Sequence, residues 1–183
     1  MHARSSTQPL SPKETTIRIS LRISIAAHCG AAHSAFIRRQ LKLAYRLLRP
    51  PLTELSIALV GDRLMSDLHS RFMSIATPTD VLTFPLEIDA EGNALSGEIV
   101  ICVPEARRRA PEHGNSLSHE LLLYALHGML HLSGYDDRTA RDYNLMHRTE
   151  DDLLSRLGIG PVFRTLRSRG PAASRVSRQR KVN

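Results

Sequence analysis

The pattern of apolar and polar residues predicts four β-strands. Two stretches alternate apolar with polar side chains at every second position, which is typical of a strand with one buried face. They cover residues 16–25 and 54–60. Two shorter apolar runs, 81–86 and 98–102, predict a second pair of strands, and the turn-rich Asp89–Asn93 between them favours a hairpin.

The spacing of apolar residues elsewhere predicts about five helices. They are expected over 34–48, 62–72, 104–112, 116–132 and 139–157. The fourth begins after a cap at Asn115 or Ser116 and is apolar nearly all round, so it should be the central buried helix. We therefore predict an α+β fold, in which a mixed four-stranded sheet is covered by about five helices.

Length and charge predict one domain with two extensions. The 183 residues fit a single domain, which we place at residues 16–160, after a disordered segment at 1–15. Residues 161–183 form a basic, disordered tail, whose cations are Arg164, Arg167, Arg169, Arg175, Arg178, Arg180 and Lys181. These seven match the net charge of +7, so the domain itself is close to neutral. The tail could attract phosphate backbones or act only as a solubilising extension.

The sequence also indicates where the protein works. It contains no apolar run long enough for a membrane-spanning helix, and the N-terminus lacks the apolar core of a secretory signal. Cys29 and Cys102 are far apart and form no paired motif, which fits a reducing cytoplasm. We therefore expect a cytoplasmic protein that does not contact membranes.

One segment of the fourth helix carries candidate metal ligands. His127 and His131 are one helical turn apart, so both side chains project from the same face. Gly134 can end the helix and let the chain fold back, which would bring Asp137 towards the imidazoles. Three nitrogen and oxygen ligands with one open position are typical of catalytic zinc. The alternative is a pair of histidines that are merely packed or solvated.

The residue after the first histidine limits the chemistry. Zinc peptidases with two helical histidines carry a general-base glutamate there, whereas this chain has Gly128. The helix therefore supplies ligands for a metal but no general base for peptide hydrolysis.

The segment from His127 to Asp136 resembles the signature of the YbeY family, the zinc-dependent endoribonucleases of bacterial ribosomal RNA maturation. Two upstream segments, Pro78–Pro85 and Gly97–Cys102, are similar to further motifs of that family in the same order. The resemblance covers roughly residues 54–157.

The resemblance implies a hydrolase that cleaves single-stranded RNA during ribosome biogenesis. It implies one Zn²⁺ per chain, bound by His127 and His131, and RNA of the ribosome or its small subunit as partner. Asp137 stands where the family has its third histidine, and we expect it to bind the metal. The neighbouring Asp136 is expected to orient a ligand or cap the turn.

A second departure concerns the family's active-site arginine. By spacing, that position is Met73 in this chain, and Arg71 two residues earlier is the candidate substitute in catalysis, although a surface arginine is the alternative. Two other functions stay open: a zinc peptidase-like hydrolase, and a non-catalytic ribosome-associated factor. The remaining polar residues of this region are expected on the surface: His113, His119, Glu120 and His147.

Overall fold

The computed structural model describes residues 20–163, which form one mixed sheet and five α-helices. The strands are β1 (Arg22–Ala27), β2 (Glu54–Val60), β3 (Val81–Ile88) and β4 (Ala94–Cys102). The helices are α1 (Ser34–Leu48), α2 (Asp62–Met73), α3 (Val103–His113), α4 (Leu117–Leu132) and α5 (Ala140–Arg156), with a short 3₁₀ turn, η1 (Ala31–His33), before α1. The predicted α+β class is confirmed. The predicted segment 1–15 and residues 164–183 of the predicted tail (161–183) lie outside the described residues, whereas residues 161–163 of that tail are described and Val162 is buried in the core.

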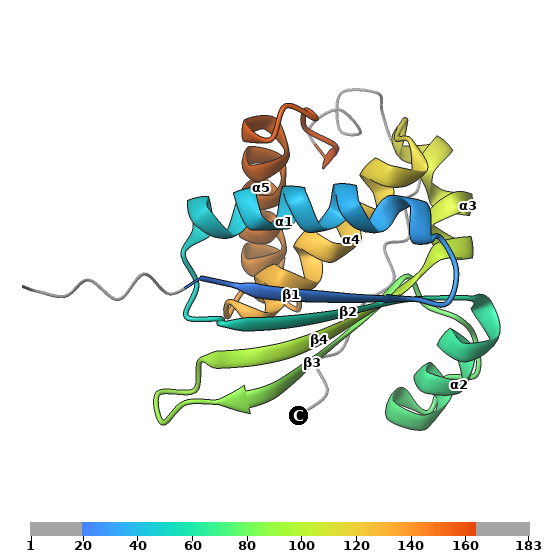
Figure 1. The fold of residues 1–183 in the computed structure, drawn as a ribbon, viewed down its shortest axis with the longest axis horizontal. Coiled ribbons are helices and arrows are strands. Elements are labelled where there is room, and N and C mark those ends of the chain that lie inside the picture. Colours follow the sequence, from blue (N-terminus) through green and yellow to red (C-terminus); the bar gives the residue numbers. More distant parts are fainter. Residues whose placement is uncertain (1–19, 164–183) are drawn as a thin grey trace, which may run out of the picture.

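The sheet has the order β1-β2-β4-β3, in which β3 is antiparallel to β4 and the other pairs are parallel. Helices α1, α4 and α5 lie on one side of it, and α2 lies on the other side near one end (Figure 1). Strand β4 shows why both faces are covered. Ile99 and Ile101 point into the larger apolar cluster beneath α1 and α4, whereas Val100 and Cys102 belong to a smaller cluster with Met65 of α2.

Local sequence signals set most of the element ends. Ser116 accepts a hydrogen bond from the His119 amide at 3.3 Å, so it is the cap of α4. Gly114 ends α3 in the left-handed conformation, at a φ of 69°. The predicted hairpin is present, because the Asp89 amide donates to the Asn93 carbonyl at 3.0 Å.

Two predicted strand bounds were wrong. Of the predicted strand 16–25, residues 20 and 21 are not in strand β1, which begins at Arg22; residues 16–19 lie outside the described range. Strand β4 begins at Ala94 and not at residue 98, because Gly97 pairs with both Leu55 and Pro85 in the ladder. A glycine inside a strand interrupts the apolar pattern without interrupting the pairing.

Helix α4 is the centre of the fold, as predicted. It is buried without a break from Glu120 to Leu132, and it contacts α1, α3, α5, β3 and β4. Gly128 lies directly over the sheet: a Cβ atom there would come within 2.8–2.9 Å of three side-chain atoms of Ile99. The glycine therefore permits the close approach of α4 to β4. Within residues 20–163, no helix has the length and apolar character needed to cross a bilayer.

We expect Gly128→Ala to destabilise the protein by about 1–3 kcal/mol, the usual range for overpacking a core. All three contacting atoms belong to the buried, β-branched Ile99, so the whole side chain would have to move and not only its flexible end. Such a movement is costly in a packed core. The change in the free energy of unfolding would be measured by urea denaturation. Combining it with Ile99→Ala removes the clash, so the double-mutant cycle should show a favourable coupling energy. A neutral or stabilising Gly128→Ala, as helix propensity alone predicts, would contradict the close approach.

Candidate metal centre

Three of the predicted site residues meet at one point. His127 and His131 project from α4, and Asp137 lies in the loop that follows. One ligand atom from each lies within 4.8 Å of the others, so the group could hold a metal ion. The two histidines are buried, at 5% and 4% exposure, whereas Asp137 is half-buried. Asp137 is therefore the most exposed of the three candidate ligands.

The turn after α4 brings Asp137 back towards the helix. Gly134 adopts a φ of 89°, and the Tyr135 amide donates to the Leu130 carbonyl at 3.0 Å, which ends the helix. The Asp136 carboxylate then accepts hydrogen bonds from the amides of Asp137 and Arg138 at 2.8 and 3.3 Å. Asp136 thus caps the turn, in the role that the sequence indicated, and leaves Asp137 to face the imidazoles.

The hydrogen bonds of the two imidazoles fix where their protons lie. His131 Nδ1 lies 3.1 Å from the Tyr135 carbonyl oxygen, which can only accept, so this nitrogen carries the hydrogen. His127 Nδ1 lies 2.7 Å from the Glu150 carboxylate, and donates to it in the same way. In the neutral form, both rings therefore present the lone pair of Nε2 to the centre.

These two lone pairs face each other. His127 Nε2 and His131 Nε2 are 3.1 Å apart, and their rings meet edge to face. Two acceptors at this distance repel unless a cation, a proton or a metal, lies between them. Two nitrogens that bind one zinc tetrahedrally at about 2.1 Å would be about 3.4 Å apart, close to the spacing found. The donor set and its geometry therefore fit a divalent metal.

Glu150 of α5 orients this centre, and sequence reasoning did not find it. The fully buried carboxylate accepts from His127 Nδ1 through one oxygen, and its other oxygen lies 2.5 Å from His147 Nδ1. Burial alone would raise the pKa of Glu150, but the two imidazoles lower it to about 2. Burial likewise would lower the pKa of His127, yet Glu150 raises it above the ordinary value. A carboxylate behind a ligating histidine is a common second layer of metal sites.

The expected surface positions of His147 and Glu120 were wrong. His147 is 5% exposed, and its ring packs between Tyr143 and Phe163, with ring centroids 4.0 and 3.8 Å away. Glu120 is fully buried at the start of α4, where His113 Nδ1 and Asn115 Nδ2 each lie 2.8 Å from its carboxylate. Both were misjudged because a polar residue on a helix can be buried when hydrogen-bond partners satisfy it, and these partners were not recognised in the sequence.

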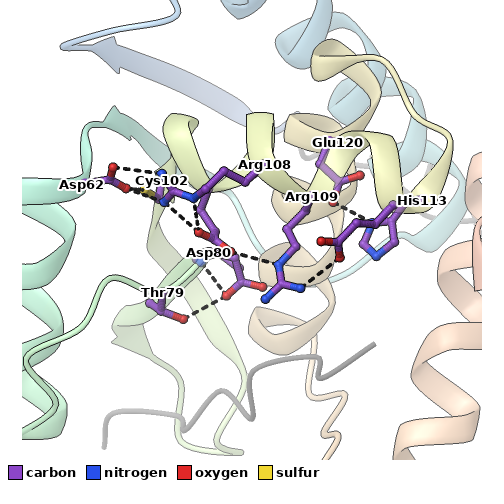
Figure 2. A network of polar contacts seen from close by, with 11 residues as sticks. Asp62, Thr79, Asp80, Cys102, Arg108, Arg109, His113 and Glu120 are labelled. Atoms are coloured by element: carbon purple, nitrogen blue, oxygen red, sulfur yellow. Dashed lines mark hydrogen bonds and ion pairs between the residues drawn. The ribbon is translucent and has the colours of Figure 1, made fainter. Parts of the chain in front are cut away.

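The Pro78–Pro85 segment places another carboxylate near the centre. Asp80 accepts hydrogen bonds from the Thr79 hydroxyl and the Val81 amide, both at 2.9 Å, at the start of β3 (Figure 2). Its charge contributes to raising the pKa of His127, after the larger effect of Glu150. The Thr-Asp pair thus adds negative charge to the region around the imidazoles.

Arg71 is not brought into the cluster. It is exposed in the last turn of α2, and within residues 20–163 no hydrogen bond or ion pair joins it to the candidate ligands. Met73 packs against the apolar cluster on the far side of the sheet. Cys102 belongs to the same smaller cluster, and burial raises the pKa of its thiol to about 12.

The fold and the site together define a small α+β protein with a candidate metal centre of two histidines and an aspartate on a buried helix. The family model described as Endoribonuclease YbeY matches residues 26–158, and the chain belongs to this family.

Individual relatives agree with that assignment. The chain is 39% identical over 115 residues to Endoribonuclease YbeY of Frankia casuarinae, and the match covers 57% of each chain. It is 39% identical to the Moorella thermoacetica protein of the same name, covering 58% of this chain and 74% of the relative. The chain thus spans little more than half the length of the Frankia relative.

A solved structure supports the fold. The solution structure of TM1509 from Thermotoga maritima matches with a TM-score of 0.52 and 24% sequence identity, over 84% of this chain and 99% of that chain.

We expect Glu150→Ala to destabilise the protein by about 3–5 kcal/mol, because both imidazoles lose their buried acceptor. Glu150→Gln should cost less, since one carbonyl oxygen remains to accept from His127. Thermal and urea unfolding would measure both. Asp152→Ala on the same helix is the matched control: its ion pair with Arg156 is exposed, and its loss should change stability by less than about 0.5 kcal/mol. Equal effects of Glu150→Ala and Asp152→Ala would refute the orienting role.

Proposed function

We propose that this chain is a metal-dependent endoribonuclease that cleaves single-stranded RNA in the maturation of ribosomal RNA. The observation that carries the proposal is the convergence of two imidazole lone pairs and a carboxylate in a chain that belongs to the Endoribonuclease YbeY family. The proposed substrate is RNA of the ribosome or its small subunit. Such a substrate would place the protein in the cytoplasm, in keeping with its two free cysteines.

We propose Zn²⁺, one per chain, as the metal, with His127, His131 and Asp137 as its ligands. Two imidazoles, one carboxylate and one open position suit zinc better than calcium or magnesium, which prefer oxygen ligands. When bound, zinc would supply Lewis-acid polarisation of a phosphodiester oxygen. The protein's own part is to hold both rings: Glu150 and the Tyr135 carbonyl each fix one Nδ1 proton, so that neither imidazole can rotate away.

Arg71 is proposed as the cation that meets the charge of the phosphate during cleavage. Its position at the end of α2 leaves the guanidinium exposed, and the following segment, residues 74–80, leads directly to Asp80. RNA lying between α2 and the metal centre would contact both Arg71 and the centre.

The peptidase alternative finds little support in the packing of α4. A general base would have to occupy position 128, where even a Cβ atom would overlap Ile99. The non-catalytic alternative predicts RNA or ribosome binding without cleavage, and the activity measurement below separates it from the proposal.

We expect about one zinc per purified chain, measured by elemental mass spectrometry. Asp137→Ala should weaken zinc affinity by at least about tenfold, since even loss of a residue behind a ligand costs that much. Asp137→His restores a nitrogen ligand and should retain the metal, and Asp152→Ala is the control for removing an exposed acid. Zinc that is retained in Asp137→Ala would move the third ligand elsewhere, for example to Asp136. A wild-type protein without zinc would favour the non-catalytic factor.

We expect His127→Ala to lower the rate of cleavage of a single-stranded RNA by at least about a hundredfold, because a bound metal contributes several kcal/mol to transition-state stabilisation. Circular dichroism and the unfolding midpoint would establish that the variant is folded. In the same assay, Arg71→Ala should lower kcat while zinc content stays unchanged, with Arg63→Ala, also exposed on α2, as its control. Undiminished cleavage by metal-stripped His127→Ala would overturn the proposed mechanism.

A further inference from the structure

Helix α1 carries cations and no acids. Five basic residues lie along it and at its C-terminal cap: Arg38, Arg39, Lys42, Arg46 and Arg49. The surrounding chain continues this bias, because residues 20–53 contain neither aspartate nor glutamate. The first acid, Glu54, forms an ion pair with Arg22 at 2.9 Å and so does not offset the charge of α1.

Helical geometry places these cations on one side. At 100° per residue, the five positions fall within an arc of about 100° on the helix surface. The buried residues Ile37, Leu41 and Ala44 occupy the opposite side, where α1 packs against β1 and α4. Four of the cations are exposed and Arg38 is half-buried, so they form a continuous basic stripe on the outside of the protein.

The side chains of the stripe have no ionic partners. Within residues 20–163, no ion pair or side-chain hydrogen bond involves any of the five. Two arginines of α3, which Figure 2 labels, behave differently: Arg108 binds Asp62 and Glu105, and Arg109 binds Glu105 and Glu112. Arg108 and Arg109 therefore belong to a neutralised network, whereas the cations of α1 have their charge available for a ligand.

We propose that the basic stripe of α1 binds the phosphate backbone of the RNA substrate, outside the metal centre. The proposal rests on the function proposed above. From Arg38 to Arg49 the helix extends about 17 Å, which corresponds to about five phosphates at the spacing of a stacked strand. The cations are spaced along the helix with no acidic neighbours, so they match the row of phosphates along an RNA strand. Contacts of this kind bind the backbone and do not recognise the base sequence.

RNA is favoured over a membrane surface because of what α1 buries. Helices that lie in a membrane interface insert an apolar face among the lipids, but the apolar face of α1 is already covered by the sheet and α4. Helix α1 packs directly on α4, the helix that carries His127 and His131 (Figure 1).

The experiment compares two sets of three neutralised cations in the full chain. The test variant is Arg39→Gln/Lys42→Gln/Arg46→Gln. The control is Arg63→Gln/Arg107→Gln/Arg156→Gln, which removes the same charge from exposed positions on α2, α3 and α5. Fluorescence anisotropy would give the Kd for a labelled 2′-O-methyl 20-nucleotide strand, which resists cleavage, at several salt concentrations.

We expect the test variant to bind about tenfold more weakly, and the slope of log K against log salt to fall by about 2, since each lost phosphate contact contributes about 0.7. The control should stay within about twofold of the wild type. Equal losses in the two sets would mean that only the net charge matters, and unchanged binding by the test variant would exclude the stripe. Loss of binding to phosphatidylglycerol vesicles, with RNA affinity retained, would assign the stripe to membranes instead.

The two proposals fail in distinguishable ways. Binding is measured without cleavage, so a wild type that binds RNA through α1 but never cuts it would contradict the proposed function alone. A test variant that cleaves and binds like the wild type would contradict the stripe alone.

Discussion

The buried carboxylate of Glu150 is the interaction on which the candidate site depends. A fully buried charge is costly unless it is paired, and here the pairing comes from His127 on one oxygen and His147 on the other. The same contact joins α5 to α4 and fixes the proton of His127 on Nδ1. Removing the carboxylate would therefore disturb the helix packing and the direction of the imidazole lone pair together.

The second constraint comes from the other side of α4. Gly128 lets the helix approach Ile99 so closely that no larger side chain fits without movement of β4 or α4. The two histidines, one residue before it and three after it, are thus held at a fixed height above the sheet. This close packing also explains why the general base of the zinc peptidases is absent: position 128, next to His127, is needed for packing and cannot carry a glutamate.

Much of the fold could be predicted from sequence because it follows from local patterns. Alternation marked the strands, and the cap at Ser116 and the glycine at 134 marked both ends of the metal helix. The meeting of His127, His131 and Asp137 followed from spacing within eleven residues. Glu150 was missed because its partner is 23 positions away, and no periodicity shows which face of α5 meets α4. His147 and Glu120 were misplaced although their polar partners are near in sequence, because periodicity did not show that their faces of α5 and α4 are buried.

The charge of the site limits how it can handle RNA. Asp137, Asp80 and Glu150 bring three carboxylates to the surroundings of the two imidazoles, and a divalent metal would offset only part of this charge. A substrate phosphate would add further negative charge, so cations elsewhere must contribute to its binding. Met73 supplies none, and Arg108 and Arg109 of α3 are held by acids. The unpaired cations of α1, on a helix in contact with α4, are the part of the described chain best suited to offset that repulsion. The metal centre and α1 would then have separate roles: the centre would act on one phosphodiester, and the cations of α1 would bind phosphates along the rest of the strand.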